Sequence, residues 1–254
     1  LRSNVYKLVL QVGIVAMAFV ACTSGPAMQP AVAAVKPGDC LALLGVSSEM
    51  ATITSATPVA AAETIGTIAV TAPFCRVQGV ARPSTDSLIN FEVWLPATAS
   101  AWSGRLKTDG TGGYAGATPI ARMAADVAAG FVAAGSDMGH SGGESADWAL
   151  GHPEKVKDWG YRAHYFVTTA AKAVTTAFYG RPAAHAYFEG CSNGGRQAMM
   201  MAQRYPDLFD GIVAGNKYTL RATKEGLGSR DEGPIPIEAG TDRSDVELKL
   251  VHHV

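Results

Sequence analysis

The sequence predicts an α/β fold in which a mostly parallel sheet carries helices on both faces. Short apolar runs alternate with longer helical patterns between residues 74 and 215, as in chains that join parallel strands by helices. Of the 254 residues, 48% are hydrophobic and 17% are charged, which suits one domain with a large core. Residues 190–195 read Gly-Cys-Ser-Asn-Gly-Gly, a G-x-S-x-G pattern typical of a sharp strand-to-helix turn.

The predicted elements alternate along the chain. Segments with the length and apolar character of strands are 74–80, 88–95, 105–108, 131–136, 184–189 and 211–215. Segments with the composition of helices are 120–129, 161–179 and 196–204. The turn residues at 83–86 separate the first two strands and predict a hairpin. Pro119 stands near the start of the first helix and Gly180 follows the second, positions typical of these residues.

Ser192 is the candidate nucleophile because it stands at the centre of the G-x-S-x-G turn. So tight a turn needs small neighbours, which Gly190 and Gly194 provide. The turn would hold the hydroxyl at the carboxyl edge of the sheet and place the N–H of Asn193 at a helix start, where it can stabilise an oxyanion. A glycine-rich turn that contains a serine by chance would show the same sequence pattern. The strand-like segment before the turn and the helix-like segment after it favour the catalytic interpretation.

A second glycine-rich segment, 110–116, follows the strand predicted at 105–108. Acyl transfer uses two donors for the oxyanion, and the second usually comes from a glycine loop after an earlier strand. Gly112 and Gly113 stand where that loop belongs. The segment matches neither the phosphate-loop spacing nor the dinucleotide fingerprint, so a plain flexible loop is the remaining alternative.

The amino terminus has the features of a signal peptide over residues 1–34. Two basic residues precede an apolar run at 8–21, and 31–34 resemble a cleavage site. The apolar run is too short for a stable membrane span. Cys22 offers a competing interpretation, as the lipid-bearing cysteine of a lipoprotein. Both interpretations predict a secreted or periplasmic protein.

Three cysteines remain if Cys22 is removed or carries lipid, and an oxidising compartment favours their pairing. A bridge between Cys40 and Cys75 would tie the amino-terminal segment to the core. Cys191 is then left over beside the candidate nucleophile. It is either a buried free thiol or a cysteine whose partner is absent from this chain.

Charge and motif content exclude several classes of partner. The net charge of −1 gives no reason to expect binding to nucleic acid or to an anionic membrane surface. No Walker-type loop and no Cys/His cluster with metal-ligand spacing occurs, so neither a metal nor another cofactor is expected. The partner predicted is a small-molecule substrate, and the oligomeric state is left open.

The chain carries a series of short motifs between residues 40 and 215. They stand at 74–77, 91–96, 102–105, 112–116, 137–140, 148–155, 178–182, 188–197 and 204–211. In this order they resemble the tannase and feruloyl esterase family of α/β-hydrolases. The Cys-Ser-x-Gly-Gly form of the turn at 191–195 is far more specific than G-x-S-x-G alone.

The resemblance implies an α/β-hydrolase core that hydrolyses esters of aromatic acids, such as feruloyl or galloyl esters, by a serine acyl-enzyme route. It implies Ser192 as the nucleophile, the N–H of Asn193 as one oxyanion donor, and the Gly112-Gly113 turn as the source of the other. It also implies that Cys191 pairs with a cysteine that follows the catalytic histidine. Calcium is expected only in the lid of the family.

After Asn216 the chain departs from the family pattern. Residues 35–216 are therefore expected to form the hydrolase core, and 217–254 to form a divergent, irregular tail. We expect a truncated product that lacks the lid, the catalytic aspartate and histidine, and the partner of Cys191.

The sequence offers two substitutes for the catalytic base. In the tail, Asp242 or Asp245 precedes the His252-His253 pair in the hydrolase order, although a disordered terminus is the simpler interpretation. His140 breaks that order, so we expect it to have a structural or substrate-lining role. A serine without a base is a weak nucleophile, and the chain is expected to hydrolyse esters slowly. The alternative function is an inactive remnant that binds aromatic ligands.

Overall fold

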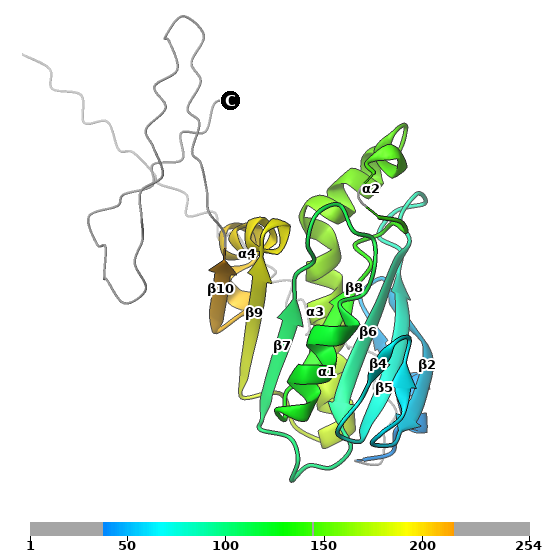
Figure 1. The fold of residues 1–254 in the computed structure, drawn as a ribbon, viewed down its shortest axis with the longest axis vertical. Helices are drawn as coiled ribbons and strands as arrows, with labels where there is room; N and C mark the ends of the chain where they lie inside the picture. Colours follow the sequence, from blue (N-terminus) through cyan, green and yellow to red (C-terminus); the bar gives the residue numbers. More distant parts are fainter. Residues whose placement is uncertain (1–37, 144, 216–254) are drawn as a thin grey trace, which may run out of the picture. The chain divides into compact units, whose positions relative to one another are not determined.

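The computed structural model describes residues 38–143 and 145–215, so the predicted signal peptide and tail lie outside the described residues. An eight-stranded sheet runs through the described part, with strand order β1-β2-β5-β6-β8-β7-β9-β10 (Figure 1). Helices pack against it from both sides, which confirms the predicted α/β class.

The elements have the following bounds. The strands of the large sheet are β1 (Ser47–Ser48), β2 (Ala51–Val59), β5 (Phe74–Ala81), β6 (Ile89–Pro96), β7 (Arg105–Asp109), β8 (Val132–Ser136), β9 (His185–Cys191) and β10 (Gly211–Gly215). A separate hairpin consists of β3 (Thr64–Ile65) and β4 (Ile68–Ala69). The α-helices are α1 (Ile120–Ala128), α2 (Pro153–Lys157), α3 (Ala163–Tyr179) and α4 (Asn193–Arg204). Short 3-10 helices span Leu41–Gly45, Asp147–Ala149 and Pro206–Leu208, and a π-helical turn spans Asp158–Arg162.

The sheet is mixed, whereas the sequence predicted a mostly parallel one. β7, β8, β9 and β10 pair in parallel, but β1, β2, β5, β6 and β8 pair antiparallel. The physical reason is the length of the connections. The predicted hairpin between β5 and β6 is too short for a crossover, whereas α1 connects the parallel neighbours β7 and β8, and α4 connects β9 and β10.

The predicted strands and helices are present, and their ends lie within two residues of the predicted ones, except that α4 begins three residues earlier than predicted. α3 begins at Ala163 because the π-helical turn occupies the preceding residues, and Gly180 ends it with φ 70°, in the left-handed region. The sequence did not predict β2, in which small and β-branched residues alternate between buried and exposed positions.

Two layers of core lie on the two faces of the sheet. On one face, α3 packs its buried Val167 and Val174 against a cluster that includes Leu106 of β7. On the other face, Met123 of α1 packs with Trp94 of β6. α4 lies on the α3 side, because its buried residues cluster with Phe188 of β9, whose ring contacts His164 of α3.

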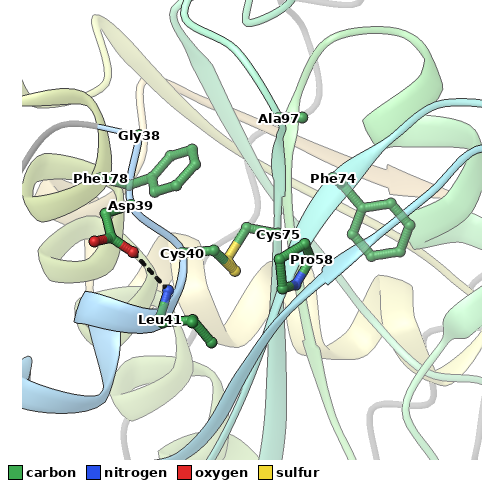
Figure 2. A pocket seen from close by; sticks show the side chains of 9 residues that line it. All are labelled: Gly38, Asp39, Cys40, Leu41, Pro58, Phe74, Cys75, Ala97 and Phe178. Atoms are coloured by element: carbon green, nitrogen blue, oxygen red, sulfur yellow. Dashed lines mark hydrogen bonds between the residues drawn. A yellow bond between two sulfur atoms is a disulfide. The ribbon is translucent and has the colours of Figure 1, made fainter.

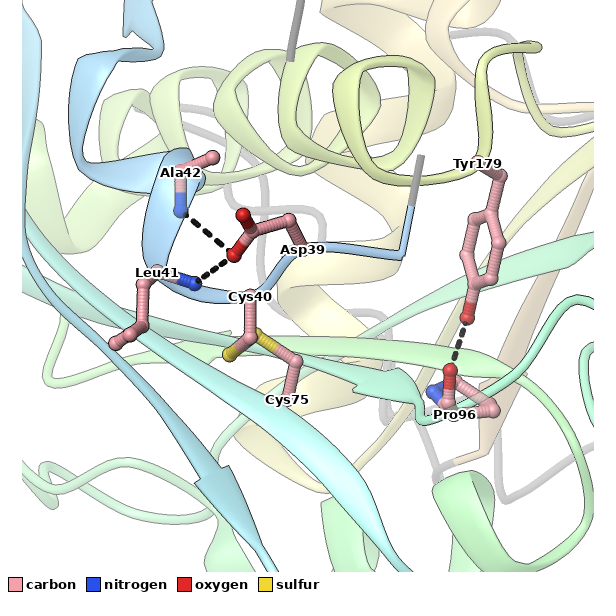
Figure 3. The surroundings of a disulfide bond; sticks show 7 residues. All are labelled: Asp39, Cys40, Leu41, Ala42, Cys75, Pro96 and Tyr179. Carbon is pink, nitrogen blue, oxygen red and sulfur yellow. Dashed lines mark hydrogen bonds between the residues drawn. A yellow bond between two sulfur atoms is a disulfide. The ribbon is translucent and has the colours of Figure 1, made fainter. Parts of the chain in front are cut away.

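Cys40 and Cys75 form a disulfide, as predicted, with their Cα atoms 5.6 Å apart (Figures 2 and 3). The bridge joins the start of the first 3-10 helix to β5, so it ties the amino-terminal segment to the sheet. The carboxylate of Asp39 accepts hydrogen bonds from the N–H groups of Leu41 and Ala42 at 3.1 and 3.3 Å, which holds this helix start in place (Figure 3).

An open groove beside the disulfide is lined by Phe74 and Phe178 among others (Figure 2). It lies at the amino ends of the parallel strands, because β6 ends at Pro96 and its Trp94 pairs with Ala133 near the start of β8. The carboxyl ends of the same strands lie at the opposite edge of the sheet. The groove is therefore remote from the serine turn, which follows the carboxyl end of β9.

Candidate active site

Ser192 occupies the turn between β9 and α4, at the carboxyl edge of the sheet. Its φ of 60° and ψ of −124° lie in a region that residues with a side chain rarely adopt. The N–H of Ser192 donates to the carbonyl of Gly215 at 2.9 Å, and its carbonyl accepts the N–H of Gly195 at 2.9 Å. The end of β10 and the first turn of α4 thus hold the strained backbone from two sides.

Glycines make this turn possible. A Cβ on Gly190 would overlap the carbonyl of Gly194, so the end of β9 and the start of α4 touch backbone to backbone. A Cβ on Gly110 would lie 2.8 Å from the Cα of Gly194. The loop after β7 therefore also packs directly on α4.

The glycine loop and the serine turn are joined by hydrogen bonds. The N–H of Thr111 donates to Oε1 of Gln197 at 2.9 Å, and Nε2 of Gln197 lies 3.1 Å from Oγ1 of Thr111. The carbonyl of Thr111 accepts a hydrogen bond from Nδ2 of Asn193 at 3.4 Å. These contacts bring Gly112 and Gly113 beside the start of α4. The roles of Gly112, Gly113 and Asn193 as oxyanion donors, and of Ser192 as the nucleophile, stay predictions.

Two buried residues that the sequence did not predict lie behind this loop. Gln197 and His164 are both 0% exposed, and Nε2 of His164 lies 3.0 Å from Oε1 of Gln197. Burial lowers the pKa of His164 to about 4, so its ring is neutral at physiological pH. Gln197 belongs to the 188–197 motif, but a single sequence gives no signal that α3 places His164 beside it.

Arg196 connects the serine turn to the π-helical turn at Asp158–Arg162. Its Nε donates to Oδ1 of Asn193 at 2.7 Å, and its remaining nitrogens donate to the carbonyls of Gly160 and Trp159 at 2.8 and 3.2 Å. The guanidinium lies over the Trp159 ring, 4.1 Å from its centroid. The side chain of Asn193 is thus fixed by the π-helical turn through Arg196.

An aromatic cluster follows the glycine loop. Tyr114, which is 45% exposed, stacks on Trp159 with ring centroids 5.4 Å apart. His140 is buried, stacks on Trp148, and places Nε2 2.6 Å from the carbonyl of Tyr114. That contact ties His140 to the loop and agrees with the structural role expected for it.

The histidines in the described part of the chain all have partners of their own. His152 contacts Asp86 at 2.8 Å, and His185 lies 3.8 Å from Asp210. His140 contacts the glycine loop and His164 contacts Gln197. The tail candidates for the base, Asp242, Asp245, His252 and His253, lie outside the described residues.

Cys191 is an exposed free thiol at the end of β9. The interpretation of this residue as a buried thiol is therefore wrong, because the alternation of β9 turns it to the face that α3 and α4 leave uncovered. The expected partner after a catalytic histidine is not among the described residues.

A group of charges lies on the α1 face, directly before the glycine loop. Nζ of Lys107 lies 2.6 Å from Asp126, 2.8 Å from Glu189 and 3.7 Å from Asp109. Asp109 is 1% exposed, and burial, reinforced by the neighbouring Asp126, raises its pKa to about 8. Asp109 therefore retains its proton at neutral pH.

Neither a metal cluster nor a membrane-spanning helix occurs in the described ranges. Within 38–143 and 145–215, no three His, Cys, Asp or Glu side chains are grouped so that they could hold a metal ion. The helices of the same ranges are all too short or too polar to cross a membrane.

The sequence matches known esterases. Residues 75–221 match the family model described as tannase and feruloyl esterase. An uncharacterized esterase of Xanthomonas campestris is 41% identical over 180 residues, which cover 69% of this chain and 31% of that protein. A probable feruloyl esterase B-2 of Aspergillus flavus is 38% identical over 147 residues, which cover 58% of this chain and 27% of that protein. The chain thus spans under a third of the length of these relatives.

Solved structures show the same architecture. Feruloyl esterase B from Aspergillus oryzae superposes with a TM-score of 0.64 and 32% identity, over 71% of this chain and 38% of that one. The tannin acyl hydrolase from Aspergillus niger gives a TM-score of 0.54 and 25% identity, over 70% and 34% of the two chains. These similarities confirm the α/β-hydrolase fold.

Proposed function

Because the chain belongs to the tannase and feruloyl esterase family, we propose that the protein is a carboxylic ester hydrolase that acts on esters of aromatic acids. One observation carries the proposal. Ser192 stands on a strained turn at the start of α4, with the glycine loop anchored beside it by Gln197 and Asn193. This is the arrangement that acyl transfer requires of a nucleophile and an oxyanion hole.

The proposed reaction uses a covalent acyl-enzyme. Oγ of Ser192 bonds to the ester carbonyl carbon while a base removes the hydroxyl proton, and the carbonyl electron pair moves onto oxygen. Backbone N–H groups of Asn193 and of the Gly112-Gly113 turn would stabilise that oxyanion. When the carbonyl re-forms, the alcohol leaves with a proton, and water then releases the acid from Ser192. We expect the base to be a histidine outside the described residues, and no metal or cofactor is needed.

The names of the relatives support the substrate class, since one is a probable feruloyl esterase and a structural neighbour is a tannin acyl hydrolase. The proposed substrate class includes both feruloyl and galloyl esters. We also infer that the protein is secreted or periplasmic, which the Cys40–Cys75 disulfide supports because such bridges persist in oxidising compartments.

A second candidate function is an inactive protein that binds aromatic ligands. It is favoured by the engagement of every described histidine with a partner of its own. The two candidates differ in whether Ser192 is chemically activated.

The experiment is covalent labelling with an aryl fluorophosphonate, followed by peptide mapping. An oxyanion hole and substrate binding alone accelerate acyl transfer by about a thousandfold over water, so we expect selective modification of Ser192 even where a base is weak. Ser192→Ala should abolish labelling, and Ser84→Ala, on the β5–β6 turn, should not. Labelling that is absent, or spread over several serines, would establish the inactive alternative.

A further inference from the structure

The carboxamide of Gln197 lies between three segments that are distant in sequence. Gln197 belongs to α4, Thr111 to the glycine loop, and His164 to α3, and all three are at least 95% buried. Oε1 of the carboxamide accepts a hydrogen bond from the N–H of Thr111, and Nε2 donates one to the hydroxyl of the same residue. Oε1 also contacts Nε2 of His164. Because burial keeps water from this junction, each of these polar atoms depends on its protein partners.

The chemistry of the partners assigns every donor. A backbone N–H can only donate, so the Gln197 atom 2.9 Å from the N of Thr111 is the carbonyl oxygen Oε1. Nε2 of His164 contacts this same oxygen at 3.0 Å and must therefore also donate. His164 is thus the neutral tautomer with its proton on Nε2, in agreement with its lowered pKa.

The junction controls the peptide that carries a predicted oxyanion donor. The N–H of Thr111 is held by Gln197, and the carbonyl of Thr111 is held by Asn193. That carbonyl and the N–H of Gly112 belong to one planar peptide unit. Fixing Thr111 at both ends therefore fixes the direction of the Gly112 N–H relative to α4, which carries Ser192 at its start.

We infer that Gln197 is a positioning residue that fixes the orientation of the glycine loop relative to Ser192. His164 in turn holds the carboxamide of Gln197 in the orientation that its contacts with Thr111 require. The inference rests on the proposed function, because it concerns the geometry of the oxyanion hole. Gln197 touches neither substrate nor reacting atoms and acts only through Thr111. The contact is specific to a carboxamide, since it needs one acceptor and one donor on the same planar group.

The test compares Gln197→Met with Gln203→Met. Methionine keeps the length of glutamine but removes both hydrogen bonds, and Gln203 is exposed on the same helix, so the second variant controls for helix propensity. His164→Gln and His164→Leu form a second pair. A glutamine amide can donate from nearly the position of Nε2 and should rescue the wild-type behaviour, whereas leucine cannot.

Two readouts separate a positioning role from a structural one. For Ser192 labelling, the limiting rate constant should fall about 10- to 100-fold in Gln197→Met and His164→Leu, with half-saturating reagent concentration nearly unchanged, because oxyanion contacts act in the transition state. Native-state amide exchange at Thr111 should quicken in the same two variants and stay as in wild type in Gln203→Met and His164→Gln.

The outcomes distinguish failure of the inference from failure of the proposed function. Faster exchange at Thr111 with an unchanged labelling rate would overturn the positioning role while the esterase proposal stands. If wild-type Ser192 does not label, the proposed function fails and exchange alone decides whether Gln197 holds the loop. Unchanged exchange in Gln197→Met overturns the inference in either case.

Discussion

Gly190 at the end of β9 packs against Gly194 in the first turn of α4 so closely that a Cβ on Gly190 would overlap the Gly194 carbonyl. This contact allows the chain to reverse at Ser192 with φ 60°. Gly110 approaches the same helix turn from the neighbouring strand. Three backbone segments therefore converge without intervening side chains, and Ser192 stands where they meet.

Gly190→Ala should disrupt the serine turn. The added methyl group meets backbone that cannot rotate away, so we expect a loss of about 3 kcal/mol of unfolding free energy or more, together with loss of Ser192 labelling. Gly143→Ala is the matched control, because a Cβ there meets open space. Urea unfolding monitored by circular dichroism measures both variants, and equal stability of the two would contradict the close packing of Gly190 on Gly194.

Asp109→Asn should stabilise the protein, and more so as the pH rises. The folded state raises the pKa of Asp109 from 3.8 to about 8. Between these values the folded protein retains a proton that the unfolded chain releases, so the native aspartate reduces stability as the pH rises through this window. Asparagine stays neutral and escapes that loss. We expect a gain on the order of 2 kcal/mol at pH 8 and little change at pH 4.

Thermal unfolding at pH 4, 6 and 8 measures this effect. Lys107, Asp126 and Arg122, the charged groups that act on Asp109, are unchanged in the variant. Asp207→Asn, at an exposed position, serves as the control and should show no such trend. A gain that is the same at all three pH values would show that Asp109 does not retain its proton.

Cys40→Ala should lower the unfolding free energy by about 3–4 kcal/mol, because the bridge to Cys75 closes a loop of 35 residues in the unfolded chain. Cys191→Ala should change it by no more than about 0.5 kcal/mol, since that thiol is exposed and unbridged. A thiol reagent applied to the native, oxidised protein should modify Cys191 alone among the described cysteines. Modification of Cys40 or Cys75 under these conditions would refute the pairing.

Arg196→Lys should not behave as a conservative change. Lysine cannot reproduce the fork that reaches Asn193, Gly160 and Trp159 together, so we expect a loss of about 1–2 kcal/mol and slower labelling of Ser192. Arg82→Lys, at an exposed position, is the control for the loss of a guanidinium. Chemical denaturation measures stability, and a labelling rate equal to wild type would show that Arg196 does not orient the turn.

Sequence patterns predicted most of the elements because the signals are local. Gly180 ends α3 as expected, and the turn at 83–86 joins β5 to β6 as expected. The α/β class was confirmed, but the sheet is mixed where a mostly parallel one was predicted, because strand pairing depends on which connections are long enough to cross over. The sequence did not predict β2, because its small residues give only a weak alternation of apolar and polar positions. Its pairing with β5 is a long-range contact that this local pattern does not reveal.

The sequence by itself determined that a serine stands on a glycine-flanked turn between a strand and a helix, because bond geometry and side-chain size act between near neighbours. It also determined that Cys40 and Cys75 could pair. Only the tertiary structure decided that Gln197 and His164 lie behind the glycine loop, and that burial raises the pKa of Asp109. Hydrogen bonding and desolvation in these two places depend on distances between separate strands and helices. Those distances exist only once the sheet has assembled.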